Sequence, residues 1–335
     1  MFIRIILCAV LLVQSVAAFE TDQYNLPPVP LADIGDEVSD YVKENLREAM
    51  NKLNAEIAKK GNSEKKLSYL RSEEAIAKKV FNELGAGIIP FTKSQNWVNS
   101  HEFKAQPARY KTSYGDSIYR INPINYLTIS PTVKLYDVQF GTDKIAHFFQ
   151  QGYDYYKKYR NGLSKGLSPA EAEKKAVNVG KFSEKTYFGT LVSGVYSNGD
   201  MVANYAGMKF YQNLTHSIKI NEIAKPPIFV LKNGFWAFNE ESGELLKPFI
   251  TNHFNEALNP SKFIFLLRPT VRATLRKKAC KTWRERFSNL SKQDFENITK
   301  DLKLWHGEDY GFSESDNFIT IGNTCFDDET KRQRD

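Results

Sequence analysis

The sequence predicts a mainly α-helical α+β fold, with a central three-helix core, an N-terminal helical hairpin and a small C-terminal mixed α/β region. Three observations predict it: apolar residues repeat at helical spacing near the N-terminus, the centre carries clear helix start signals, and an Asn-Gly pair further on separates two short apolar runs. We expect residues 19–90 to form a tail and the hairpin, 91–220 the core with its loops and short strands, and 221–335 the mixed region.

The hairpin is predicted from two apolar patterns that follow a proline-containing tail at residues 19–31. From about Ile34, apolar side chains recur at helical spacing, at Val38, Tyr41, Val42, Leu46, Met50 and Leu53. Residues 61–63 should end this helix. A second helix is expected over residues 64–84, and it should end at Gly85 and Gly87, since glycine is common just after helix C-termini.

Three helices are predicted in the central part. They follow residues 91–140, where Tyr, Asn, Ser and Pro are frequent and short strands are expected at 126–129 and 132–135. The first helix should run from Asp143 to about Arg160, with Gly141 or Thr142 as its N-cap. The second begins with a capping Ser168, a proline in the first helical position and Glu171, and it should continue to about residue 187. The third should cover residues 200–213.

The C-terminal region combines strand and helix patterns. Apolar runs at residues 228–231 and 235–238 flank Asn233 and Gly234, and this arrangement favours a β-hairpin. Helical segments are expected around residues 273–287 and 292–304. The charged end, residues 327–335, should fray.

Residues 1–18 have the build of a cleavable signal peptide. Arg4 gives a cationic start, an apolar run covers residues 5–13, and small residues lead to Ala18. The run is too short to span a bilayer, so we expect export to the periplasm or the extracellular space and no integral membrane span in the mature chain. Two cysteines then remain, Cys280 and Cys325. An oxidising compartment favours a disulfide between them over two buried free thiols.

The net charge is +7 and is expected to be spread along the chain. Such a charge is compatible with contact to an anionic envelope lipid or polymer. It does not by itself indicate nucleic acid, and the predicted export argues against a nucleic-acid partner.

The polar residues of the three central helices form the candidate site. Asp143 and His147 are four residues apart and therefore share a helix face. Glu184 follows two small residues, Ala176 and Gly180, at four-residue steps that would let a neighbouring helix approach. On the third helix, Asp200 and Asn204 form one stripe with Gly207 and Tyr211. If the three faces meet, the polar side chains converge in a buried site.

Two chemistries suit this set of residues. Asp143, His147, Glu184, Asp200 and Asn204 all have side chains that can ligate a divalent cation. In the catalytic interpretation, His147 is the acid–base group, and Asp143 and Glu184 position it or a metal. No zinc-protease, nucleophile-elbow or phosphate-loop motif is present, so whether the protein is an enzyme stays open.

Each residue also has a structural explanation. Asp143 can interact with the positive end of its helix dipole, and Asp200 can form a capping box with Ser197. His147 can be a hydrogen-bonded core histidine, and Glu184 can lie on a solvated face beside two lysines.

The order and spacing of these residues resemble a known family pattern. Asp143-Lys144-x-x-His147-Phe148, then Glu184, then Ser197-x-x-Asp200-x-x-x-Asn204-x-x-Gly207 is similar to the pattern of VanZ-like membrane proteins and YfiM-like proteins. The resemblance covers about residues 141–211. It implies a cell-envelope setting and marks the residues above, without a defined reaction. In that family the pattern often lies on membrane-spanning helices, whereas these helices are rich in Lys, Tyr and Glu.

The sequence therefore predicts an exported cell-envelope protein of undefined activity with a buried polar site. The site would bind or hydrolyse a phosphate-bearing or lipid-linked envelope ligand, through a divalent cation. The alternative is a non-catalytic envelope scaffold or interaction protein whose polar network only fixes the packing of its helices. The sequence leaves the substrate, the metal and the oligomeric state undetermined.

Overall fold

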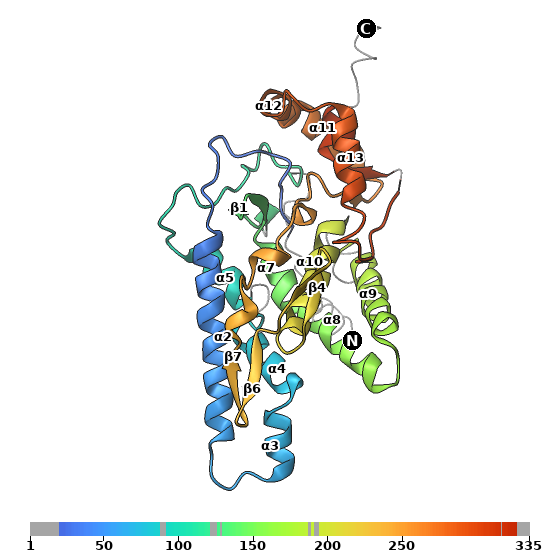
Figure 1. Cartoon of the computed structure of the whole chain (residues 1–335). Helices are drawn as coiled ribbons and strands as arrows, with labels where there is room; N and C mark the ends of the chain where they lie inside the picture. The colour runs from blue at the N-terminus through green and yellow to red at the C-terminus, as the bar shows by residue number, and fades with distance from the viewer. Residues whose placement is uncertain are drawn as a thin grey trace, which may run out of the picture.

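The computed structural model describes residues 20–87, 92–120, 126–127, 129–186, 189–190, 194–315 and 317–326. The predicted signal peptide and the charged C-terminal end lie outside these residues. Figure 1 shows a mainly helical α+β fold with a few small sheets, which confirms the predicted fold class. None of the helices in the described part of the chain combines the length and apolar character needed to cross a bilayer.

The N-terminal hairpin is present, with one correction. Helix α2 (Gly35–Ile57) buries its apolar stripe and packs against α4 (Glu73–Leu84). The predicted second helix is wrong as a single element, because α3 (Glu64–Leu70) ends before α4 begins. Ser72 causes the interruption: its hydroxyl caps α4 by accepting a hydrogen bond from the N–H of Ala75, at 3.2 Å.

The stretch before the central helices contains more regular structure than predicted. An unpredicted helix, α5 (Lys93–Ser100), starts at Thr92, whose hydroxyl caps it. The expected strand at residues 132–135 is β1 (Thr132–Leu135), which pairs with β2 (Val138–Gly141) in an antiparallel hairpin. The other expected strand, at 126–129, lies partly outside the described residues, and Tyr126 and Leu127 are helical. β2 leads directly into the first central helix.

The central core has the three predicted helices. The first is a continuous helix made of α7 (Asp143–Ala146), a π-helical turn η1 (His147–Gln151) and α8 (Gly152–Ser164). The second is α9 (Pro169–Lys185), with the predicted capping box. The third is α10 (Asn198–Asn213), which is buried along its whole length. The first helix passes the expected end at residue 160, and the chain turns only at Gly166, which has a φ of +83°.

Close approach of these helices depends on glycines. A Cβ on Gly207 of α10 would lie 2.0 Å from the carbonyl oxygen of Phe148, and one on Gly180 of α9 would lie 1.5 Å from the hydroxyl of Tyr155 on α8. The expectation that Gly180 lets a neighbouring helix approach is therefore confirmed.

Small sheets connect the core to the C-terminal region. Strands β6 (Phe229–Lys232) and β7 (Phe235–Phe238) form the predicted hairpin, with Asn233 and Gly234 at positive φ. A second hairpin pairs β4 (Ile218–Ile220) with β5 (Ile223–Lys225). An unpredicted three-stranded sheet has the order β3 (Val195–Ser197), β8 (Ser261–Phe263) and β9 (Phe318–Ile319). Three short 3₁₀ turns lie in between, η2 (Glu240–Ser242), η3 (Lys247–Phe249) and η4 (Asn252–Phe254).

The C-terminal helices build a second apolar core. It is formed by α11 (Arg268–Lys278), α12 (Cys280–Arg286), α13 (Lys292–Asp301) and α14 (Ile321–Cys325), and α11, α12 and α13 lie together at the top of Figure 1. Cys280 and Cys325 form the predicted disulfide. The N-terminal tail packs into the same core, where the Trp283 indole donates to the carbonyl of Tyr24 at 2.7 Å. This path places Glu20 and Thr21 beside the central helices.

Candidate functional site

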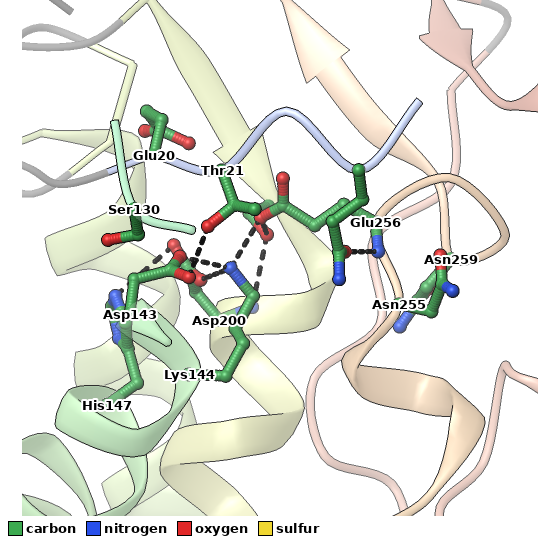
Figure 2. A network of polar contacts seen from close by, with 12 residues as sticks. Glu20, Thr21, Ser130, Asp143, Lys144, His147, Asp200, Asn255, Glu256 and Asn259 are labelled. Carbon is green, nitrogen blue, oxygen red and sulfur yellow. Dashed lines mark hydrogen bonds and ion pairs between the residues drawn. The ribbon is translucent and has the colours of Figure 1, made fainter. Parts of the chain in front are cut away.

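A buried lysine lies at the centre of the polar network (Figure 2). The Lys144 ammonium is 2.5 Å from a carboxylate oxygen of Asp143, 2.6 Å from one of Asp200 and 2.6 Å from one of Glu256. The lysine side chain is fully buried, and the three carboxylate side chains are between 1% and 5% exposed. Three carboxylates therefore share one positive charge away from water.

The helix ends explain why these side chains meet. Asp143 and Lys144 begin α7, and Asp200 lies in the first turn of α10, where the helix dipole favours negative charge. Ser197, the N-cap of α10, accepts from the N–H of Asp200 at 3.1 Å and donates its hydroxyl proton to Glu256 at 2.7 Å. The predicted cap at Ser197 is therefore present, while the Asp200 carboxylate itself binds Lys144.

The N-terminal tail closes the network from the other side. The hydroxyl of Thr21 donates to Asp143 at 2.5 Å, and the side-chain carbonyl of Gln23 accepts from the N–H of Glu256 at 2.5 Å. Glu20, which is 2% exposed, lies in the same region. The N-terminal tail is therefore joined to the central core by hydrogen bonds of the polar network.

His147 is the most exposed member of the network, with 17% of its side chain accessible. Its Nδ1 is 3.0 Å from the side-chain oxygen of Asn204, and its Nε2 is 3.4 Å from a carboxylate oxygen of Asp200. Two residues of the α10 stripe therefore fix the orientation of the imidazole ring.

Glu184 joins the network through Ser197. Its carboxylate accepts from the backbone N–H of Ser197 at 3.1 Å, and the residue is 3% exposed. The alternative of an exposed Glu184 on a solvated face is therefore wrong. The five residues singled out from the sequence all belong to one network, although Glu184 reaches the others through Ser197.

Burial and neighbouring charges raise the pKa of some acids of the network and lower the pKa of another. Burial, with the nearby Asp200, raises the pKa of Glu184 well above its usual range, and burial raises the pKa of Glu256 to about 7. Burial also acts on Asp200, but the positive charges of His147 and Lys144 outweigh it, so the pKa of Asp200 is lowered. Burial opposes the charged form of Lys144, but its carboxylate neighbours outweigh this and raise its pKa. The pKa shifts therefore favour the charged forms of Lys144 and Asp200 and the protonated form of Glu184.

One group of acids has the spacing of a cation site. Carboxylate oxygens of Glu20, Asp200 and Glu256 lie within 4.8 Å of one another, and all three residues are buried. Only Asp200 belongs to the ligand set predicted from the sequence. Between Asp143, Asp200 and Glu256, the Lys144 ammonium already takes the position that a cation would occupy.

Sequence reasoning misses the central Lys144, Glu256 and the tail residues Glu20, Thr21 and Gln23. Lys144 stands beside Asp143 in the sequence, but a lysine is usually a surface residue, so its position alone indicates no role in the core. Glu256 and Thr21 lie 112 and 122 residues from their partners, and no local pattern links them.

Comparison with family models, curated proteins and solved structures gives no match for this chain. The candidate site therefore has to be interpreted from its own chemistry.

Proposed function

We propose that this chain is an exported cell-envelope protein that holds a divalent cation in its buried acidic network and through it binds a phosphate-bearing or lipid-linked envelope ligand. Export is supported by the signal-peptide pattern of residues 1–18 and by the Cys280–Cys325 disulfide. The cation is supported by the charge balance of the network, which is the single observation that carries the proposal.

The charge balance is negative even after the pKa shifts are considered. Asp143, Glu184, Asp200 and Glu256 are buried around one lysine and one histidine within the described residues. The raised pKa of Glu184 favours its uncharged form, and Glu256, with a pKa of about 7, is partly protonated at neutral pH, whereas the pKa of Asp200 is lowered. Glu20 offers a further carboxylate oxygen as a ligand, within 4.8 Å of those of Asp200 and Glu256. Uncompensated buried charge is costly, and oxygen-rich acidic sites suit Mg²⁺, Ca²⁺ or Mn²⁺.

A bound divalent cation would also explain how an acidic site can bind an anionic ligand such as a phosphate. The charge of Lys144 is already neutralised by three carboxylates, so it offers little attraction to a phosphate. A divalent cation on Glu20, Asp200 and Glu256 would supply that attraction. In a catalytic version, His147 is the acid–base group, because it is partly exposed and its ring is held by Asn204 and Asp200.

A specific observation favours the second candidate, a non-catalytic scaffold. The network is almost entirely buried, and the Lys144 ammonium fills the point where three carboxylates converge. Such a network can fix the packing of helices and the tail without binding anything.

Calorimetric titration with Mn²⁺, Mg²⁺ and Ca²⁺ separates the two. We expect saturable binding of one cation to the wild-type chain, and at least a tenfold weaker affinity for Glu20→Gln and Asp200→Asn. Glu173→Gln is the matched control, because Glu173 belongs to a separate cluster with Lys209 and should leave binding unchanged. Absence of cation binding to a folded wild-type chain would eliminate the cation site and leave the scaffold.

The variant His147→Ala provides a second test that separates the structural scaffold from a ligand-binding or catalytic site. If the network is only structural, the variant should melt at a markedly lower temperature, because Asn204 and Asp200 lose a buried partner. If His147 acts on a ligand at the edge of the network, activity or ligand affinity should fall while the melting temperature changes little.

A further inference from the structure

Two large apolar side chains are exposed next to each other, outside the acidic network and nine residues after Glu256. Phe265 is 74% exposed and Leu266 is 77% exposed. They lie in the turn between strand β8 and helix α11. A single exposed apolar residue needs no explanation, but two consecutive ones at one turn form an exposed apolar pair, here called the apolar tip.

Basic residues flank this apolar tip in the sequence. Lys262 is exposed on β8, and the guanidinium of Arg268 lies 5.5 Å from the centre of the Phe265 ring. Residues 257–284 contain no aspartate or glutamate and eight basic residues: Lys262, Arg268, Arg272, Arg276, Lys277, Lys278, Lys281 and Arg284. This one internal segment therefore carries more positive charge than the net charge of the whole chain.

Some of these basic side chains form hydrogen bonds within the fold, and others are exposed at the surface. Arg272 contacts the segment of β9 and α14, and Arg284 donates to the carbonyl of Cys325. Arg276 and Lys277, by contrast, are exposed and have no ion-pair partner among the residues that the structure describes. Helix α11, which begins two residues after the apolar tip, therefore carries exposed positive charge in its last turn.

We propose that this turn and helix α11 form a membrane-docking surface that inserts Phe265 and Leu266 into the interfacial region of an anionic lipid bilayer. An exposed apolar pair with adjacent basic residues has the two features that bind peripheral proteins to such bilayers, apolar burial and attraction to acidic headgroups. Charge decides against a second copy of the chain, because two such surfaces facing each other would repel. The apolar pair distinguishes the surface from one that only neutralises a soluble polyanion.

The sheet connects the docking surface to the acidic network. In the antiparallel pairing of β3 with β8, Val195 faces Phe263 and Ser197 faces Ser261. Ser197 caps α10 and bonds Glu256, whereas the apolar tip follows the other end of β8. The chain from Ser261 to Phe265 spans at most about 14 Å. Docking would therefore hold the network close to the lipid headgroups, although the docking proposal stands independently of the proposed cation.

Vesicle binding by the full chain tests the proposal. Phe265→Ser with Leu266→Ser should weaken sedimentation with vesicles of phosphatidylcholine and phosphatidylglycerol about tenfold or more, since two apolar side chains no longer insert. Arg276→Glu with Lys277→Glu should weaken it and reduce its salt dependence. Ile223→Ser is the matched control, because Ile223 is 72% exposed at a different hairpin, and it should bind like wild type. All variants share residues 1–19, so differences between them report on the docking surface.

A local measurement guards against binding through other parts of the chain. The added indole of Phe265→Trp should shift its emission to shorter wavelength with phosphatidylglycerol vesicles, and much less with phosphatidylcholine alone. Unchanged binding of the Phe265→Ser, Leu266→Ser variant, together with an unshifted indole, would overturn the proposal. So would a dimer in solution that dissociates in this variant while vesicle binding is absent, since the apolar tip would then dock a second copy.

Discussion

Replacing Lys144 with methionine tests whether charge holds the network together. Methionine keeps much of the side-chain volume but removes the ammonium, whose nitrogen lies 2.5–2.6 Å from carboxylates of Asp143, Asp200 and Glu256. The three acids would then face one another in the core without a central cation. Removing one partner of a buried ion pair costs about 3–5 kcal/mol of unfolding free energy, because the remaining charge is left uncompensated. For a chain of this size we expect a melting temperature lower by roughly 4–7 °C.

The loss should depend on pH in a defined direction. Without the lysine, protonation becomes the way to remove the carboxylate charges, so the folded-state pKa values of these acids should rise. An acid with a raised folded pKa contributes stability that is present below its unfolded pKa and is lost as pH rises through the folded value. Glu256 already shows this in the wild type, with a pKa of about 7 against an ordinary value of 4.5. The deficit of Lys144→Met should therefore be largest at about pH 8 and smaller at about pH 5.

Thermal unfolding of wild type and variant across this pH range, followed by circular dichroism, measures both effects. Lys209→Met is the matched control. The Lys209 ammonium lies 3.0 Å from Glu173 and 2.8 Å from Glu308, but those side chains are 22% and 32% exposed and can be solvated. Its loss should be smaller, about 1–2 kcal/mol, with little pH dependence. A deficit of Lys144→Met that is the same at every pH would refute the argument, because lost packing alone would then explain it.

Three further predictions concern stability. Glu256→Gln should remove part of the fall in wild-type melting temperature as pH rises through about 7, because the variant has no carboxyl at this position to ionise. Replacing Cys280 and Cys325 with serine should lower the unfolding free energy in urea by about 4 kcal/mol, since the disulfide closes a loop of 45 residues. Gly207→Ala should lower it by about 1–3 kcal/mol, because the new Cβ would meet the Phe148 carbonyl at 2.0 Å, whereas Gly115→Ala has open space and should change little.

Local signals in the sequence were reliable wherever a few neighbouring residues decide the structure. Ser168 and Glu171 start α9 with the predicted capping box, and Asn233-Gly234 turns the predicted hairpin. The same rule explains the error in the hairpin helices. Ser72 is also a capping residue followed by acidic residues. Because the helical pattern continues on both sides of it, the sequence predicts one helix where Ser72 starts a second one.

The candidate site was predictable only as far as its residues lie on regular helices. Asp143 and His147 were placed together because of four-residue spacing, and so were Asp200 and Asn204. The packing of the first central helix against α10 brings the two pairs together, so that His147 contacts both Asp200 and Asn204. Glu256 could not be predicted, because it follows a 3₁₀ turn in an irregular segment and no periodicity marks it. Its contact with Lys144 depends on tertiary packing alone.

The stripe on α10 explains how the fold keeps His147 in place at the edge of the network. Asp200 pairs with Lys144, and Asn204 bonds His147, one turn further along each helix. The contact between Tyr211 and Phe149 depends on the π-helical turn η1. In this turn the N–H of Gly152 bonds the carbonyl of His147, five residues earlier, instead of the carbonyl four residues earlier as in an α-helix. The carbonyl of Phe149 accepts from the hydroxyl of Tyr211 at 2.8 Å, two steps after Asn204 along the stripe. Polar contacts therefore join α10 to the first central helix on both sides of His147, which holds the imidazole rigidly where solvent reaches the network.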